Sequence, residues 1–203
     1  MWYPNALIRP GPAWKQNANP LWPQGVVCHS AVGFAGGLHD VLDSNTPSSW
    51  HFSIMYSGLV EQHYSTDVQC WHAQAANSFA VGIEHEGGYN PENEPLTPAQ
   101  LASSIALVRW LGEVHNFELR RDEPGRTLFE HNQFYPKPCP SGRIPWEEYA
   151  VVNVGDKPRK LDVASPDDQD LRAMISALVN NRIAPLRFDP DGRAVYEMSI
   201  VLP

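Results

Sequence analysis

The residues best suited to chemistry lie in the segment HNQFYPKPCP, residues 131–140, which holds a histidine, a lysine between two prolines and a cysteine. A proline disfavours the helical conformation of the residue before it, so Lys137 and Cys139 are expected to lie in an extended stretch. Residues i and i+2 of an extended chain point the same way, so the lysine ammonium and the cysteine sulfur are expected to face one site.

The chain has eight histidines that could join this cysteine. Five of them stand at the ends of predicted strands or in the loops that follow, where α/β folds collect active-site groups: His29, His51, His72, His85 and His131. The other three are expected on surface faces or at helix ends, without a chemical role: His39, His63 and His115.

Zinc binds mixed nitrogen and sulfur ligands, and three protein ligands with one open position form the catalytic arrangement. The segment around Cys139 is therefore consistent with a zinc site. A Cys-His nucleophile pair and an inert buried thiol remain open as alternatives, because spacing alone does not separate them.

Alternating short strands and helices must position these groups. The patterns predict a buried strand at 25–29, a short helix at 37–44, two strands joined by a Ser57-Gly58 turn within 51–64, and a strand within 79–88. The fold class that follows is α/β, with a mixed central β-sheet flanked by helices.

The strongest helix signal begins at Thr97, a favourable N-cap, with Pro98 at the first helical position and Gln100 completing a capping box. One face then repeats apolar side chains at helical spacing: Leu101, Ile105, Val108 and Leu111. This stripe indicates a helix that packs on the sheet rather than a binding site.

Residues 1–155 are predicted to form the catalytic domain and residues 156–203 a small appendage of unknown role. In the appendage, Ser165 and Pro166 open a predicted helix that runs to Arg182. The Asp-Pro-Asp-Gly sequence at 189–192 then predicts a hairpin turn.

The composition limits the possible partners. With 203 residues, of which 42% are hydrophobic, the chain can bury one core. The net charge of −8 and the absence of a Lys/Arg run argue against nucleic acid. The first residues lack the pattern of a signal peptide and no apolar stretch predicts membrane insertion, so we expect a cytoplasmic product. Three cysteines, an odd number, suggest reduced thiols.

Five segments together resemble the zinc-dependent N-acetylmuramoyl-L-alanine amidases, a family that includes phage amidase endolysins and peptidoglycan recognition proteins. In chain order they are VVCHSA, WHFSIMYSGLVEQHY, CWHAQAANSFAVGIEHEGG, LTPAQLASSIALVRWL and EHNQFYPKPCPSGRIPW. The resemblance covers roughly residues 20–150. It implies that the chain hydrolyses the amide bond between N-acetylmuramic acid and L-alanine in peptidoglycan.

By this resemblance the Zn²⁺ ligands are His29, His131 and Cys139. Lys137 takes the place of the family lysine that stabilises the developing oxyanion, and Glu84 matches the glutamate that some branches use as general base. Three further residues are expected to bind substrate: Trp50, His72 and Asn77.

One residue departs from the family pattern, because Trp50 occupies the position of a catalytic tyrosine in many relatives. An indole N–H donates but does not ionise usefully, so Glu84 is expected to carry the base role. His51 and His85 could line the same cleft or pack beside it. Arg143 could contact a stem-peptide carboxylate or form an ion pair at the start of a helix. The remaining thiols, Cys28 and Cys70, are expected to be buried apolar groups.

The expected function is that of a phage or prophage endolysin that stays in the host cytoplasm until it reaches the wall. Two alternatives are a non-catalytic peptidoglycan-binding protein on the same scaffold and a cytoplasmic amidase that recycles soluble muropeptides. The complete His, His and Cys set favours an enzyme, whereas Trp50 favours the binding protein.

Overall fold

The computed structural model describes residues 1–88, 94–150, 187–188 and 194–195. The chain divides into two units, Met1–Val152 and Asn153–Pro203. In the second unit, β9 (Arg187–Phe188) pairs antiparallel with β10 (Ala194–Val195), as expected for the predicted hairpin. The predicted helix at 166–182 and the hairpin's turn lie outside the described residues, so the appendage remains a prediction.

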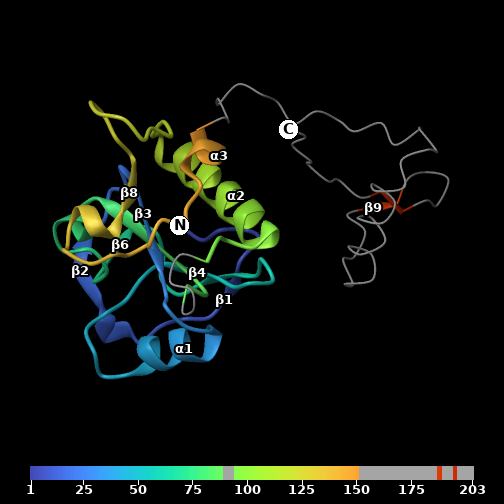
Figure 1. Cartoon of the computed structure of the whole chain (residues 1–203). Coiled ribbons are helices and arrows are strands. Elements are labelled where there is room, and N and C mark those ends of the chain that lie inside the picture. The colour runs from blue at the N-terminus through green and yellow to red at the C-terminus, as the bar shows by residue number, and fades with distance from the viewer. Residues whose placement is uncertain (89–93, 151–186, 189–193, 196–203) are drawn as a thin grey trace. The chain divides into compact units, whose positions relative to one another are not determined.

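A six-stranded mixed sheet organises the first unit (Figure 1). From edge to edge its strands are β1 (Leu7–Ile8), β5 (Val60–Gln62), β4 (Phe52–Ile54), β7 (Ala80–His85), β3 (Gly25–Ser30) and β8 (Leu128–Glu130). Strands β4, β7, β3 and β8 run parallel, whereas β5 is antiparallel to β4. The predicted strands and the mixed sheet are confirmed.

The turn between β4 and β5 requires its predicted glycine. Gly58 has a φ of +82°, in the region that L side chains rarely adopt, and an added Cβ would lie 2.8 Å from the Ala99 carbonyl oxygen. The hairpin therefore closes where the sequence predicts it.

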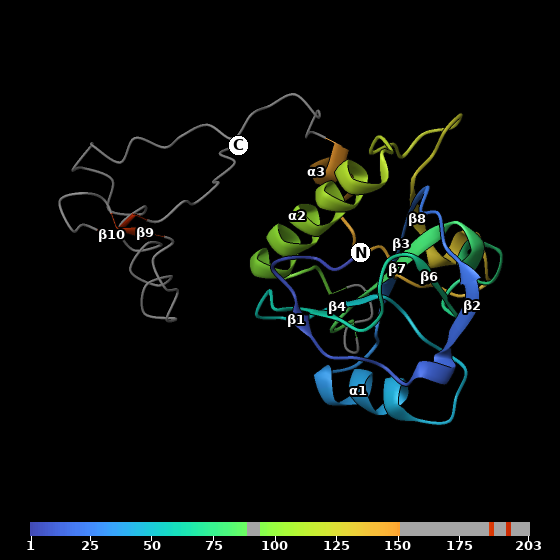
Figure 2. The same cartoon turned by 180° about the vertical axis from the view of Figure 1, so that it is seen from behind.

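Helices cover the two faces of the sheet, with α1 (Ala35–Asp43) and α2 (Pro98–His115) on opposite sides in both views (Figures 1 and 2). Buried apolar residues form separate clusters on the two sides of the sheet. Val26, Ile83 and Phe52 pack with the α2 side, whereas Trp50 and Met55 pack with Leu38 and Leu42 of α1.

The other elements are a two-stranded sheet of β2 (Gln16–Pro20) and β6 (Val68–Cys70), the short 3-10 helices η1 (Ala13–Lys15), η2 (Gln74–Ser78) and η3 (His131–Gln133), and α3 (Trp146–Ala150).

The capping box of α2 is present as predicted, since the Thr97 hydroxyl accepts from the Gln100 amide and the Gln100 side chain accepts from the Thr97 amide. The Gln100 side-chain amide also donates to the carbonyls of Ile54 and Glu86, at 3.1 and 2.9 Å. The start of the helix is thereby tied to the carboxyl ends of β4 and β7.

The apolar stripe of α2 is rotated slightly from the prediction. Val108 and Leu111 are fully buried, and so is Leu107, whereas Leu101 and Ile105 are partly buried and pack at the edge of the core. The ridge against the sheet is therefore centred on Leu107. No helix in the described ranges is long and apolar enough to cross a bilayer.

Candidate metal centre

The ligand atoms of His29, His131 and Cys139 lie within 4.8 Å of one another. His29 is near the end of β3, and His131 directly follows β8, which is the parallel neighbour of β3 with Cys28 opposite Glu130. Parallel neighbours end at the same edge of a sheet, so this pairing brings the two histidine rings to a centroid separation of 4.5 Å.

Cys139 is held at this edge by backbone contacts. Its Sγ accepts a hydrogen bond from the Ser30 amide at 3.2 Å and lies 4.0 Å from His29 Nδ1. The Asn132 amide donates to the Cys139 carbonyl at 2.9 Å, which ties the cysteine to the turn that carries His131. Sequence reasoning did not include Ser30, because a backbone donor leaves no side-chain signal.

Burial is the main cause that raises the pKa of Cys139 to about 12, followed by the nearby Glu84 carboxylate. The pKa of His29 is lowered well below its ordinary value, first by burial. Burial, followed by the charge of Lys137, lowers the pKa of His131. Both rings are therefore neutral, as metal ligands must be, and a bound metal would displace the thiol proton of Cys139.

Glu84 lies beside the ligands because β7 pairs in parallel with β3 and places Glu84 opposite His29. Its Oε1 is 3.8 Å from His29 Nδ1, and its buried Oε2 has no hydrogen-bond partner among the described residues. Burial raises the pKa of this carboxyl to about 8. A buried carboxylate oxygen without a partner is costly. A cation with its solvent would supply that partner, so the residues present fit a metal.

The sequence model described as N-acetylmuramoyl-L-alanine amidase matches residues 17–142, which is more than half of the chain. The chain belongs to this family. The match spans the three candidate ligands and Glu84, and it confirms the resemblance seen in the sequence. The protein is thus an enzyme, an amidase that hydrolyses peptidoglycan.

Solved structures show the same fold. The amidase LysC from Clostridium intestinale URNW is 23% identical with a TM-score of 0.57, over 73% of this chain and 97% of that one. A mutant endolysin from Bacillus subtilis is 19% identical with a TM-score of 0.58, over 72% and 97%. AmpD is 20% identical with a TM-score of 0.55, over 74% and 95%. No curated protein sequence matches significantly.

In the amidase, the segment around Lys137 bends instead of running extended, so that prediction is wrong. Lys137 lies in a bend and Cys139 in a turn. The Lys137 amide donates to the Tyr135 carbonyl at 2.7 Å, which closes a tight turn centred on Pro136. The exposed Lys137 ammonium lies 5.1 Å from the centroid of the Tyr135 ring, which stacks on His131 at 6.1 Å. Lys137 therefore contacts Tyr135, and Tyr135 in turn contacts His131 of the cluster.

Trp50 is only 4% exposed and lies in the core beneath α1. Its indole N–H donates to Ser53 Oγ at 2.7 Å, and Ser53 Oγ lies 2.8 Å from His63 Nε2. The ring as placed offers a substrate almost no surface, so the structure gives Trp50 a packing role. His63 is itself buried, so its expected surface position is wrong.

The predicted substrate residues His72 and Asn77 contact each other. The Asn77 side-chain carbonyl accepts from the amides of His72 and Ala73, at 3.0 and 2.7 Å. His72 Nδ1 lies 3.1 Å from His29 Nε2. Asn77 thus shapes the loop that brings His72 next to the candidate ligand His29.

Neither alternative for Arg143 describes its position. The side chain is buried, and it donates to Ser30 Oγ at 2.8 Å and to the Glu86 carbonyl at 3.0 Å. It therefore fastens the loop after Cys139 to the ends of β3 and β7. His85 is also buried, between the His29 carbonyl and Ser104 Oγ on the α2 side, away from the cluster.

Three further predictions concern buried groups. Cys28 and Cys70 are fully buried free thiols, as expected. His51 is buried behind His72, with ring centroids 5.9 Å apart, which corresponds to packing beside the site.

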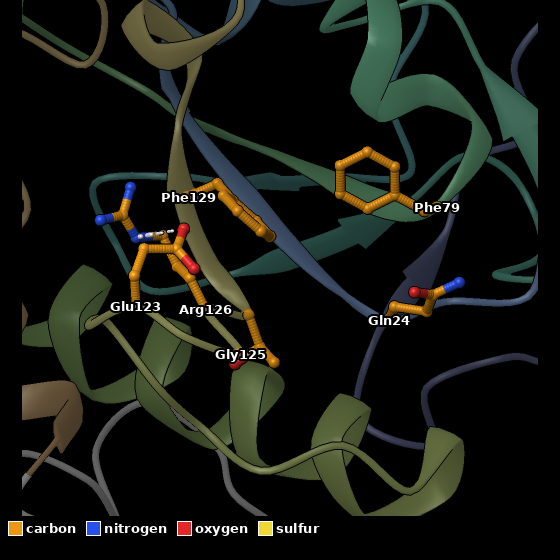
Figure 3. Close-up of a pocket in the computed structure, with 7 residues that line it drawn as sticks. Gln24, Phe79, Glu123, Gly125, Arg126 and Phe129 are labelled. Carbon is orange, nitrogen blue, oxygen red and sulfur yellow. Dashed lines mark ion pairs between the residues drawn. The ribbon is translucent and has the colours of Figure 1, made fainter.

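A separate hollow of about 440 Å³ is lined by Phe79 and Phe129 with Gln24 and the Glu123–Arg126 ion pair (Figure 3). All of its lining residues except Phe129, which lies within β8, come just before β3, β7 or β8, so the hollow lies at the amino ends of these parallel strands. The metal cluster lies at their carboxyl ends. This hollow is therefore distinct from the candidate active site.

Proposed function

We propose that the amidase cleaves the bond between N-acetylmuramic acid and L-alanine at a zinc centre held by His29, His131 and Cys139. The observation that supports this is the convergence of three neutral donors within 4.8 Å, next to a buried carboxylate oxygen without a partner. Two imidazoles and one thiol form a donor set that suits zinc and leaves a fourth position open.

Zinc held there would polarise the scissile carbonyl and make water a stronger nucleophile. Glu84 accepts a proton from the attacking water as the oxygen–carbon bond forms. It then returns the proton to the leaving amine of L-alanine as the carbon–nitrogen bond breaks. Its raised pKa in the metal-free protein suits a group that must both accept and release a proton, and a nearby cation would lower that pKa toward the working pH.

Lys137 contributes a positive charge on the exposed side of the cluster. Lys137 is exposed and lies over the Tyr135 ring, so its ammonium can approach the carbonyl oxygen of a bound substrate and offset the negative charge that develops there. His131, which packs under the same tyrosine, is thereby placed between this cation and His29.

We propose that the amidase acts as an endolysin, which is made in a host cell and degrades the intact wall of that cell. The similarity in fold to a Bacillus subtilis endolysin supports it. Peptidoglycan is then the macromolecular substrate, and the net charge of −8 is consistent with a partner other than nucleic acid.

Digestion of purified sacculi with zinc-loaded and chelator-treated protein tests this function, with the products read by mass spectrometry. We expect free stem peptides that begin at L-alanine, lost on chelation and restored by zinc. Binding to the sacculi without release of peptide would instead identify a non-catalytic receptor. Cleavage of soluble muropeptides but not of sacculi would identify a recycling amidase.

A further inference from the structure

The ring of His72 contacts His29 on the Nε2 side, whereas Cys139 lies on the Nδ1 side of His29. His29 Nε2 and His72 Nδ1 are 3.1 Å apart, and the rings meet edge to face at a centroid distance of 5.3 Å. The other nitrogen of His72, Nε2, is 3.1 Å from the carbonyl oxygen of Ala80. Both nitrogens of His72 are therefore engaged within the protein.

The direction of these hydrogen bonds follows from the Ala80 carbonyl, which can only accept. His72 Nε2 must therefore carry a hydrogen, and a neutral imidazole then has only a lone pair at Nδ1. A charged His72 would stand beside a cation site and is disfavoured there. His29 Nε2 is consequently the donor to His72, which leaves the lone pair of His29 at Nδ1.

That free nitrogen is the one that faces the cluster. His29 Nδ1 lies 4.0 Å from Cys139 Sγ and 3.8 Å from Glu84 Oε1. The hydrogen bonds from His29 to His72 and from His72 to the Ala80 carbonyl thus direct the lone pair of His29 Nδ1 toward the other candidate ligands.

The surroundings of His72 hold its ring in this position. An added Cβ on Gly82 would lie 2.6 Å from His72 Cγ, so the ring lies against β7 where only glycine fits. The edge of His51 packs on the ring, and His51 is itself fixed because it accepts from the Gly82 amide and its Nε2 lies 2.9 Å from the Val68 carbonyl. The Asn77 side-chain carbonyl accepts from the His72 amide and holds its backbone.

We propose that His72 is a positioning residue that keeps His29 protonated at Nε2 and presents its Nδ1 to the metal. This inference rests on the zinc centre proposed above. It gives His72 a role different from the substrate contact that the sequence suggests, because both of its ring nitrogens already have partners inside the protein.

The tautomer can be read directly in the metal-free, full-length protein. Two-bond ¹H–¹⁵N correlation spectra distinguish a histidine protonated at Nε2 from one protonated at Nδ1. We expect His29 and His72 both to carry their hydrogen on Nε2. A spectrum with His29 protonated at Nδ1 would overturn the proposal without the need for any variant.

Two variants of similar shape isolate the acceptor atom. His72→Asn places a carbonyl oxygen near the position of Nδ1, whereas His72→Leu places a methyl group there. We expect His72→Leu to weaken zinc binding by about 10- to 100-fold in competition with a chromophoric chelator, the range typical for groups that orient metal-bound histidines. His72→Asn should bind zinc nearly as well as the wild type, with His29 still protonated at Nε2.

Equal zinc affinities of the two variants would overturn the proposal, because the acceptor atom would then have no effect. The outcome also separates this proposal from the proposed function. Wild-type protein that binds no zinc would reject the zinc centre as a whole, whereas zinc binding with His29 protonated at Nδ1 would reject the role of His72 alone.

Discussion

Replacing Glu84 with glutamine should make the metal-free protein more stable and the zinc-loaded enzyme much slower. The carboxyl lies 3.8 Å from His29 Nδ1, keeps one buried oxygen without a partner, and has a pKa raised by burial to about 8. Glutamine has the same shape but neither ionises nor accepts a proton from water. The substitution therefore tests both how strongly burial opposes ionisation of this carboxyl and its role as the base.

The size of the stability effect follows from proton linkage. In the unfolded chain the carboxyl has its ordinary pKa of about 4.5, whereas in the folded protein the pKa is about 8. The folded state thus holds the proton more tightly, and the wild type loses stability as the pH rises from 4.5 to 8. At about 1.4 kcal/mol per unit, the accumulated loss is about 3 kcal/mol by pH 7.

Urea unfolding of metal-free wild type and Glu84→Gln between pH 4.5 and 8 measures this difference. The stability of the variant relative to the wild type should increase steadily across that range. Glu118→Gln is a matched control, because the Glu118 side chain is 82% exposed, and it should show no such trend. A constant difference between wild type and Glu84→Gln across the range would refute the argument that burial controls this carboxyl.

The activity of the same variant tests the proposed base. Loss of a general base typically costs about 10²- to 10⁴-fold in rate, while zinc should stay bound because Glu84 is not one of the three ligands. Turnover near that of the wild type in zinc-loaded Glu84→Gln would remove Glu84 from the mechanism.

The remaining predictions concern the ligand, the core and the pH response. Cys139→Ala should lose zinc and activity together, whereas Cys70→Ala, which changes a buried thiol outside the cluster, should keep stoichiometric zinc. Trp50→Phe should lower stability by about 1 to 3 kcal/mol, because it leaves the Ser53 hydroxyl without its donor, but should leave kcat/KM nearly unchanged; a large loss of activity at full stability would contradict the packing role. Burial lowers the pKa of His63 to about 4, so the unfolded chain takes up a proton first and stability should fall by about 3 kcal/mol between pH 6.5 and 4. His63→Gln should lack that part of the acid response in urea unfolding, and an unchanged response would show that His63 does not titrate in this way.

The structure also explains how the core accommodates Trp50. The indole donates to Ser53, and the Ser53 hydroxyl lies 2.8 Å from His63 Nε2. His63 Nδ1 in turn lies 2.8 Å from the Arg9 carbonyl. This buried chain of polar groups satisfies the indole N–H within the core, so the ring has no need of a partner at the metal cluster.

Local patterns were enough to predict most of the elements. The capping box at Thr97, the Gly58 turn and the apolar strand at 25–29 depend on backbone conformation and burial over a few residues, so the sequence determines them directly. The family resemblance predicted His29, His131 and Cys139 as ligands, and the structure brings these three residues together. By itself the sequence thus determined the fold class and the family, and it predicted a donor set whose residues the structure brings together.

Only the tertiary structure decided which partners the residues around the candidate site contact. Whether His72 faces substrate or His29, and whether Arg143 is exposed or buried, depends on strand register and loop packing between residues far apart in the chain. Residue type does not encode such contacts, because a histidine or arginine can satisfy its hydrogen bonds with water, substrate or protein equally well. The pairing of β3 with β7 and β8 sets the choice, since it fixes which polar groups meet at the carboxyl edge of the sheet and which are buried behind it.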